Sequence, residues 1–494
     1  MNSAALVSPD AIRAQFSRAM SALYKSEVPL YGRLLELVAE TNAQVLRTQP
    51  EVAERLRSSG EIERLEAERH GAIRVGTAEE LSTLRRLFAV MGMQPVGYYD
   101  LAPAGVPVHA TAFRPIHEAA LQVSPFRVFT SLLRLQLIED AGLRERAAEL
   151  LSRRRIFTPR AIELIEQCEA AGGLQAGEAG EFVREALETF RWHGQATVSA
   201  EQYRQLHDQH RLIADVVAFK GPHINHLTPR TLDIDAIQAG MSQRGITPKA
   251  VIEGPPRRNC PILLRQTSFK ALQEAVAFVG QDGPQGSHTA RFGEIEQRGA
   301  ALTAKGRALY DRLLDSARQA LGEAPSEANA RRYDALMAEH FQAFADDQET
   351  LRREGLAYFR YFPTPVGLAA VNQANRPRGL DALIEAGHVR CEPLVYEDFL
   401  PVSAAGIFQS NLGGGVRADY ALAASQADFQ LALGAVVQDE LSLYAETQRR
   451  SLQACASALC LEALTDARGT GHSAPLTPRS TLCESDPCTN AVWR

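Results

Sequence analysis

Two parts of the 494-residue chain repeat each other at a constant spacing, and this repeat restricts the possible folds more than any other feature. Setting His70 on His226 gives an offset of 226 − 70 = 156 residues, and the same offset places Arg74 on Arg230 without a gap. Three further pairs obey it: Thr111 and Thr267, Phe113 and Phe269, Arg114 and Lys270. We therefore expect two copies of one structural unit.

Each copy has the pattern of a strand, a helix and two further strands. The first strand opens with histidine, in HGAIR or HLTPR, and the last ends in TAFR or TSFK. Thr77 with Glu80 fits a capping box, and Asp233 can cap the helix that starts DIDAIQAGM. HTARFGEIEQ adds a fourth strand to the second copy. The pattern predicts an α+β fold built on two βαβββ-type modules.

The remaining segments divide by periodicity into strands, helices and a tail. Helical spacing marks residues from about 10 to 66, 130 to 215 and 300 to 355, which we interpret as large helical insertions and layers. Further strands are expected at PVGYYDL, VPVHATAF, ADVVAFKG, KAVIEGP, PILLRQTSF and YFRYF. The predicted organisation is a helical lead-in (1–66), a first metal-binding module (67–130), a helical insertion (131–215), a second metal-binding module (216–300), a helical layer with a strand segment that completes the site (301–460) and a disordered tail (461–494).

Composition narrows the class of partner. The formal net charge of −6 provides no basic field for a phosphate backbone, so nucleic acid is not expected as a partner. The first residues lack a secretory pattern, and no apolar run approaches membrane-spanning length. The seven cysteines are scattered and never spaced C-x-x-C, which indicates reduced thiols. We expect a cytoplasmic protein with a small-molecule substrate and no membrane partner.

Paired βαβββ modules resemble the vicinal oxygen chelate superfamily, in which a cupped sheet surrounds one divalent metal. Proteins of that superfamily place metal ligands on the first and fourth strands of their modules. Here the first strands begin with His70 and His226, and the fourth strand of the second copy carries Glu294. The resemblance implies a metal site with two histidines and one carboxylate.

Such a ligand set leaves open positions on the metal. This suits Fe(II) that binds a bidentate substrate together with O2. Imidazole and carboxylate also suit zinc, so a hydrolase or an isomerase stays open on ligand type alone.

The spacing leaves two of the three ligand positions undecided. His223 lies three residues before His226, so the two face opposite sides of an extended segment, and Gly221-Pro222 places His223 in a turn. Glu296 shares a strand face with Glu294, and parity does not choose between them.

Two other histidines are candidates for the site. His288 lies six residues before Glu294, roughly 20 Å along a strand, which is too far to bind the same ion. His109 falls on a predicted strand near the site, where a structural role is the favoured interpretation.

Four longer strings carry a more specific resemblance: RHGAIRVGTAEEL, FKGPHINHLTPRTLDIDAI, SHTARFGEIEQRGAALT and YEDFLPVSAAGIFQSNL. They are similar to the bacterial 2-oxoadipate dioxygenase/decarboxylase family from about residue 8 to about residue 460, and only the tail departs from it. The resemblance implies an Fe(II) enzyme of lysine degradation that converts 2-oxoadipate and O2 to D-2-hydroxyglutarate and CO2.

The family resemblance also implies site residues. It places the metal at His70, His226 and Glu294, and so selects these over His223 and Glu296. It implies substrate contacts at both histidines, at Arg74, which is also the catalytic residue, and at Val402 and Ser403.

Arg74 suits that role on physical grounds. It follows His70 by four residues, on the same face of the strand and about 13 Å further along it. With the 2-oxo end of a six-carbon diacid on the metal, a planar guanidinium can pair with the distal carboxylate through two hydrogen bonds. The run LPVSAAG offers small side chains and backbone N–H groups for a carboxylate.

Two other functions fit the same scaffold. One is a glyoxalase-type isomerase or lyase that uses the metal as a Lewis acid without O2. The other is a non-catalytic protein that binds a 2-oxo acid. A requirement for O2 distinguishes the dioxygenase from the isomerase or lyase. Turnover distinguishes both enzymes from the non-catalytic binding protein.

Overall fold

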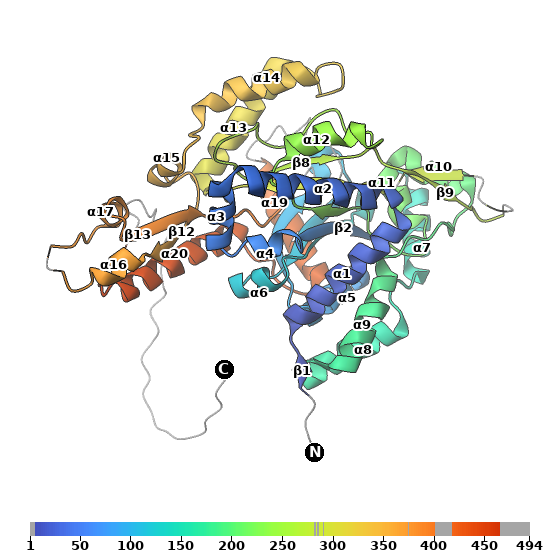
Figure 1. Cartoon of the computed structure of the whole chain (residues 1–494). Coiled ribbons are helices and arrows are strands. Elements are labelled where there is room, and N and C mark those ends of the chain that lie inside the picture. Colours follow the sequence, from blue (N-terminus) through green and yellow to red (C-terminus); the bar gives the residue numbers. More distant parts are fainter. Residues whose placement is uncertain are drawn as a thin grey trace. The chain divides into compact units, whose positions relative to one another are not determined.

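The computed structural model describes residues 5–280, 283, 286–289, 291–373, 375–400 and 417–464. The chain contains both helices and strands, so the fold is mixed as expected (Figure 1). The chain divides into two compact units, of which the larger takes in residues 1–361 and 391–451 and the smaller residues 362–390 and 452–494. The side chains discussed below belong to the larger unit.

A five-stranded sheet holds the first half of the site. Its order is β3 (Gln94–Asp100), β4 (Val108–Arg114), β5 (Arg127–Leu133), β2 (Arg69–Val75) and β7 (Leu227–Pro229). Neighbours are antiparallel except β2 and β5, which run parallel. The helix after β2 precedes β3, so the first copy has the expected strand, helix and two strands. Strand β5 adds a fourth strand that we had placed at the start of a helical segment.

The second copy continues from β7 through α12 (Ile234–Gln243) to β8 (Leu264–Ser268) and β11 (Glu294–Arg298). Strands β8 and β11 are antiparallel, and a parallel bridge joins the residue after β7 to β11. The segment 248–253 makes antiparallel bridges to the β8 region, where we had expected a strand at KAVIEGP. The repeat at 156 residues thus corresponds to two similar successions of strands.

Strand β2 shows which face of the sheet holds the site. Ile73 and Val75 join a core with side chains of α5 (Ala78–Val90), whereas Ala72 joins a second core that includes the apolar side of α11 (Arg211–Val217). Alternate residues of a strand share a face. His70 and Arg74 therefore face the side of α11.

The predicted strand HTARFGEIEQ is wrong as a single element. The structure has β10 (Gly286–Thr289), which pairs with β9 (Gln273–Val276), and β11 begins five residues after β10 ends. Between them the backbone bonds elsewhere, since Arg291 accepts from Leu272 and Phe292 donates to Asn225. His288 therefore lies on a strand pair of its own.

The predicted strand ADVVAFKG is also wrong, because α11 covers its first half. Every residue of this helix after the first is buried, so its apolar run has no polar face to reveal a helical period. The side chain of His210 caps the helix by accepting the Leu212 N–H at 3.1 Å.

Residues 9–65 are mostly helical, as the periodicity predicts. The helices are α1 (Pro9–Glu27), α2 (Pro29–Thr48), α3 (Pro50–Ser58) and α4 (Ile62–Leu65). The first three each begin at a proline, which is favoured at the first helical position and interrupts the preceding helix.

The later helical segments are confirmed apart from β5 and a short strand. They contain α7 (Ala141–Arg153), α8 (Pro159–Ala171), α9 (Ala176–Leu187), α10 (Ala200–Gln209), α13 (Ala304–Leu321), α14 (Ala330–His340) and α15 (Gln348–Arg353). The other elements are β1 (Leu6–Val7), α6 (Glu118–Val123), β6 (Leu174–Gln175), β12 (Phe359–Pro363), α16 (Pro365–Ala369), α17 (Leu380–Glu385), β13 (Val389–Pro393), α19 (Arg417–Leu433) and α20 (Glu440–Ala458). None of the helices in the described residues combines the length and the apolar character needed to cross a membrane.

The predicted helix caps are present with one difference. The Thr77 hydroxyl accepts the Glu80 N–H at 3.1 Å, and Asp233 accepts the Ala236 N–H at 3.0 Å. The Glu80 carboxylate accepts from the N–H of Gly76, not of Thr77 as a capping box requires.

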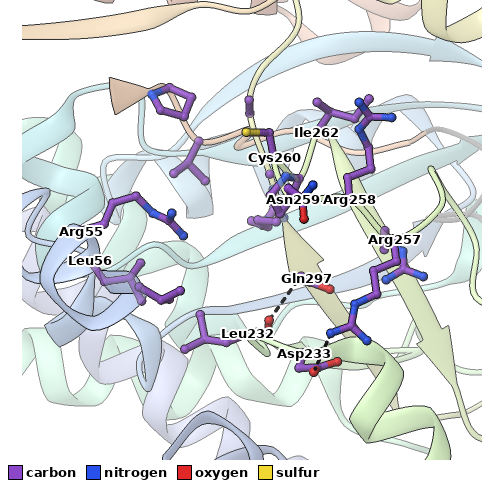
Figure 2. Close-up of a pocket in the computed structure, with 18 of the residues that line it drawn as sticks. Arg55, Leu56, Leu232, Asp233, Arg257, Arg258, Asn259, Cys260, Ile262 and Gln297 are labelled. Carbon is purple, nitrogen blue, oxygen red and sulfur yellow. Dashed lines mark hydrogen bonds and ion pairs between the residues drawn. The ribbon is translucent and has the colours of Figure 1, made fainter. Parts of the chain in front are cut away.

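A cavity of about 430 Å³ lies among α3, the segment 255–262 and the end of β13 (Figure 2). Polar groups on its wall pair with one another, as where Gln297 donates to the Leu232 carbonyl at 3.0 Å. None of the three predicted metal ligands lines this cavity. It is therefore separate from the candidate site.

Candidate metal centre

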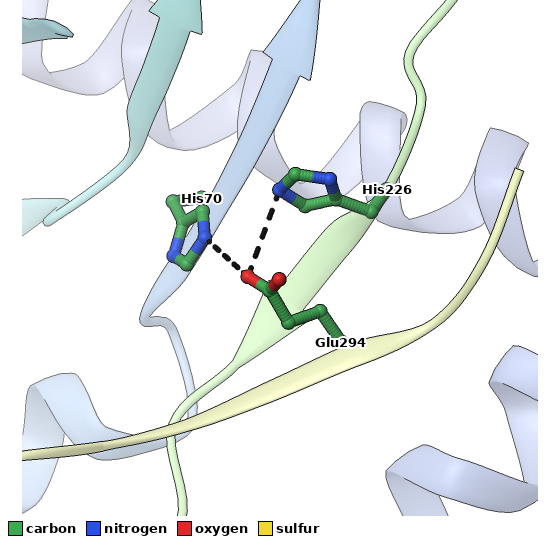
Figure 3. A group of neighbouring side chains, drawn as sticks. All are labelled: His70, His226 and Glu294. Carbon is green, nitrogen blue, oxygen red and sulfur yellow. Dashed lines mark hydrogen bonds and ion pairs between the residues drawn. The ribbon is translucent and has the colours of Figure 1, made fainter. Parts of the chain in front are cut away.

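His70, His226 and Glu294 come together although up to 224 residues separate them (Figure 3). His70 is the second residue of β2, His226 directly precedes β7, and Glu294 opens β11. Oε1 of Glu294 lies 3.1 Å from Nε2 of His70 and 3.7 Å from Nε2 of His226. One ligand atom from each residue lies within 4.8 Å of the other two, and all three side chains are buried.

The close approach of β2 to the segment before β7 depends on a small residue. A Cβ added to Gly71 would lie 2.5 Å from Cδ1 of Ile224 and 2.9 Å from the carbonyl oxygen of His226. A side chain at this position would push the two histidines apart. Glycine beside the first histidine is thus part of the local sequence that forms the site.

The histidine nitrogens test whether these residues fit a metal. Neither ring nitrogen of His226 has a hydrogen-bond partner among the described residues, although the side chain is fully buried. A buried polar atom without a partner costs about 1 to 3 kcal/mol. A cation held by Nε2 of His226, Nε2 of His70 and Glu294 would remove that cost for the His226 Nε2 atom. Two imidazoles with one carboxylate are a common ligand set for a divalent transition metal. The residues therefore fit a metal ion.

Two neighbours hold the Glu294 carboxylate in place. The Thr228 hydroxyl donates to its Oε1 at 3.1 Å, and Nε2 of Gln266 donates to the same oxygen at 3.0 Å. Such contacts fix the orientation of a metal-binding carboxylate.

Glu296, the alternative to Glu294 in the sequence, has a different place. Its Oε2 lies 3.2 Å from Nδ1 of His70, on the ring edge opposite the one that faces Glu294. Two hydrogen bonds from Arg298, at 2.7 and 3.0 Å, hold the Glu296 carboxylate. Glu296 can therefore orient His70 from behind.

The pKa values follow from burial and from these carboxylates. Burial lowers the pKa of His226 to about 4, which keeps its imidazole neutral and able to bind a metal. Burial would also lower the pKa of His70, but the Glu296 and Glu294 carboxylates outweigh it and raise that pKa. For Glu294 the effect of burial is outweighed by His226 and His70, so its pKa is lowered and it stays ionised.

A layer of buried charges supports the site on this face of the sheet. Glu68 accepts from Arg127 at 2.7 Å and from Arg230 at 3.1 Å, and Glu397 accepts from Arg64 and Arg127. We did not predict this layer from the sequence. The sequence feature that could have indicated it is the arginine inside the apolar strand FRVFTSLL, because a buried arginine requires a buried partner.

Arg74 lies on β2 on the same face as His70 and is mostly buried. Its Nη1 donates to Oδ2 of Asp215 on α11 at 2.7 Å. Arg74 thus lies on the strand face that carries His70, paired with an acid that the sequence analysis did not identify.

The other candidate histidines lie outside the three-residue cluster. Nε2 of His223 receives a hydrogen bond from Asn225, and His288 lies between Asp215 and Tyr203. His109 lies on β4, on the strand face that points toward α5. Its ring packs against Phe429, with ring centres 4.7 Å apart. A structural place for His109 agrees with the favoured interpretation.

Val402 and Ser403 lie outside the described residues. The chain that leads to them does pass the site. The ring of Phe399 packs edge-on against His70, with ring centres 4.8 Å apart.

Comparison with known proteins agrees with this geometry. The family model described as 2-oxoadipate dioxygenase/decarboxylase matches residues 16–411. The chain is 71% identical to a Pseudomonas putida protein of that name over 92% of this chain and 98% of the other, and 58% identical to one from Escherichia coli over 91% and 98%. A solved Pseudomonas putida hydroxyglutarate synthase in complex with 2-oxoadipate superposes with a TM-score of 0.88 at 71% identity, covering 92% of this chain and 99% of that one.

Proposed function

The chain belongs to the 2-oxoadipate dioxygenase/decarboxylase family, and we propose on this basis that it converts 2-oxoadipate and O2 to D-2-hydroxyglutarate and CO2 in lysine degradation. The similarity extends over nine-tenths of the chain, and the solved Pseudomonas putida relative is described in complex with 2-oxoadipate. The single observation that carries the proposal is the buried cluster of His70, His226 and Glu294.

These three residues would hold one Fe(II) ion. The unpaired nitrogens of His226 and the neutral state that burial gives its ring support this assignment. When bound, Fe(II) supplies open coordination positions for a 2-oxo acid and O2 and the redox chemistry that decarboxylation and hydroxylation require.

The residues around the cluster would orient the substrate. With the 2-oxo carboxylate end at the metal, Arg74 lies about 13 Å further along β2 on the same face, in reach of the distal carboxylate through its long side chain. Its guanidinium can form a charge-assisted pair with that group. We assign further contacts to Val402 and Ser403, which lie outside the described residues, on the family resemblance of the segment YEDFLPVSAAGIFQSNL.

Aromatic side chains would keep water from the reacting atoms. Phe399 packs on His70, and Phe292 packs on His226 with ring centres 4.9 Å apart. Both rings are largely buried. Exclusion of water strengthens the pairing of charged groups inside the site and protects a reactive intermediate from hydrolysis.

The strand pairings support the finer fold assignment. We propose that the two copies are βαβββ modules joined through β2 and β7 into one cupped, vicinal oxygen chelate-like sheet. The antiparallel pairing of β2 with β7 and the bridge from the residue after β7 to β11 support this assignment.

Anaerobic reconstitution tests the proposed function. The protein is loaded with Fe(II) without O2 and mixed with 2-oxoadipate, and O2 is then admitted while O2 uptake and products are measured. We expect one CO2 and one D-2-hydroxyglutarate per O2 consumed. Product formation without O2 would indicate the glyoxalase-type alternative, and tight binding of 2-oxoadipate without turnover would indicate the non-catalytic one.

A further inference from the structure

Asp215 connects the proposed substrate arginine to a set of buried polar side chains. It lies on α11, which packs over the face of the sheet that holds His70. Its side chain is 6% exposed and receives the 2.7 Å hydrogen bond from Arg74, which is 11% exposed. The proposed function gives this acid no role.

The pairing engages only part of the guanidinium. Within the described residues the Arg74 side chain makes one hydrogen bond, from Nη1 to Oδ2 of Asp215. Arginine has five N–H donors in a rigid plane, so the remaining donors are available to a second carboxylate. One acid can thus fix the plane while another binds its free edge.

Asp215 is itself held on its other oxygen. Nε2 of His288 donates to Oδ1 at 2.9 Å, and Nδ1 of His288 is hydrogen-bonded to the Tyr203 hydroxyl at 2.7 Å. A carboxylate only accepts hydrogen bonds, so Nε2 is the nitrogen that donates to Asp215. Rings of Trp192 and Phe219 flank His288, with centres 6.1 and 4.9 Å from it. His288, which is itself held by Tyr203, therefore fixes the Asp215 carboxylate through the oxygen that does not contact Arg74.

Arg74 is the arginine in direct contact with Asp215, at 2.7 Å. Nε2 of His223 lies 3.6 Å from Oδ1, and burial lowers the pKa of His223 to about 3. Burial would raise the pKa of Asp215, but His223, Arg74 and His288 outweigh it and lower that pKa, so the carboxylate stays ionised.

We propose that Asp215, supported by His288 and Tyr203, is the positioning residue that aims the guanidinium of Arg74 at the distal carboxylate of the substrate and so selects a diacid. The inference rests on the proposed function, in which Arg74 binds that carboxylate. Asp215 does not touch the substrate in this arrangement. It acts by holding the long Arg74 side chain in one orientation, which reduces the side-chain entropy lost on binding.

The opposite role for Asp215 makes a different prediction. If Asp215 occupied the place of the substrate carboxylate, its removal would free Arg74 and improve binding of 2-oxoadipate. A positioning role requires that its removal weaken binding.

Steady-state kinetics of four Fe(II)-loaded proteins tests the proposal: wild type, Asp215→Asn, Arg74→Ala and the double variant. Each is assayed with 2-oxoadipate and with 2-oxohexanoate, which has the same length but no distal carboxylate. We expect Asp215→Asn to lower kcat/KM for 2-oxoadipate about 10-fold to 100-fold, mostly through KM, and for 2-oxohexanoate less than about 3-fold. In the Arg74→Ala background, adding Asp215→Asn should change kcat/KM for either substrate by no more than about 3-fold, since the two residues act as one unit.

A matched control is available in the same sheet. Asp100 pairs with Arg134 at 3.1 Å and is similarly buried, but neither residue belongs to the site. Asp100→Asn should leave both kcat/KM values within about 3-fold of wild type. His288→Gln keeps the Asp215–Arg74 ion pair and provides a second variant if Asp215→Asn does not fold. It should show a smaller loss, again confined to the diacid.

Three results would overturn the inference. They are equal losses on the two substrates, a full additional loss in the Arg74→Ala background, and an unchanged or improved kcat/KM for 2-oxoadipate. Wild-type protein that binds iron but does not turn over 2-oxoadipate would contradict the proposed function itself and remove the inference with it.

Discussion

Oε2 of Glu296 lies 3.2 Å from Nδ1 of His70, while Nε2 of the same ring faces Glu294 at 3.1 Å. The two carboxylates that the sequence could not rank thus lie on opposite edges of one imidazole. One faces the metal cluster and the other faces Arg298, which forms two hydrogen bonds with it. A carboxylate behind a metal-binding histidine fixes the ring orientation and makes the nitrogen a better ligand.

Glu296→Gln should therefore weaken metal binding without removing a ligand. We expect the affinity for Fe(II) to fall about 10-fold to 100-fold, measured by anaerobic titration. Glu80→Gln is the matched control, because Glu80 also accepts two hydrogen bonds from a buried arginine, Arg154, and lies outside the cluster. An affinity equal to that of wild type in the Glu296 variant would show that this contact does not support the metal.

Replacing any member of the cluster should abolish both iron binding and turnover. His70→Ala, His226→Ala and Glu294→Ala each remove one of the three proposed ligands. Iron content after reconstitution and O2 uptake are the measurements. His223→Ala and His288→Ala should keep their iron, because these side chains bond to Asn225 and Asp215. Normal iron content in the Glu294 variant would remove that residue from the ligand set.

Arg74→Ala should impair turnover of 2-oxoadipate far more than iron binding. Loss of a charge-assisted partner in a buried site costs about 2 to 4 kcal/mol, or roughly 30-fold to 1000-fold in kcat/KM. Arg74→Lys should recover only part of the loss, because an ammonium keeps the positive charge but lacks the two-pronged geometry of a guanidinium. The deficit should shrink for a monocarboxylic 2-oxo acid of similar length. Equal deficits on both substrates would indicate that Arg74 supports the strand or the metal shell.

The stability of the protein should fall on acidification in part through His109. Burial, with the nearby Arg134, lowers the pKa of His109 to about 4, below its value of about 6.5 in an unfolded chain. The neutral ring therefore stabilises the fold above pH 6.5, and this contribution is lost as the pH falls toward 4. From pH 7 to pH 5 we expect a loss of about 1 to 2 kcal/mol, allowing for partial exposure.

His109→Gln removes this titration and should reduce the acid-induced loss by that amount. Denaturant unfolding of both proteins at pH 7 and pH 5 provides the comparison. The same loss in both proteins would show that His109 does not contribute to it.

Several elements of the site could be predicted because they depend on local pattern. The repeat at 156 residues placed His70 and His226 at equivalent strand starts, and the structure joins those strands in one sheet. Thr77 and Asp233 begin helices as their side chains suggest. Strand alternation also placed Glu294 and Glu296 on one face, but their separate roles depend on which edge of a distant ring each reaches.

The remaining features depend on contacts that no local pattern records. Asp215 lies 141 residues from Arg74 in the chain, and its segment ADVVAFKG is apolar enough to suit a buried strand or a buried helix. Strand β5 was missed because its apolar run continues into a helical segment. The break between β10 and β11 follows from backbone bonds to Leu272 and Asn225, far from the break in sequence.

Isotopically labelled O2 tests the central claim most directly. The Fe(II)-loaded protein is supplied with labelled O2 and unlabelled 2-oxoadipate in ordinary water, and the product is analysed by mass spectrometry after quenching. If decarboxylation and hydroxylation occur on one substrate molecule, one labelled atom should enter the new carboxylate of D-2-hydroxyglutarate and the other its new hydroxyl. Product without label, or with a hydroxyl oxygen drawn mainly from water after correction for exchange, would contradict the account.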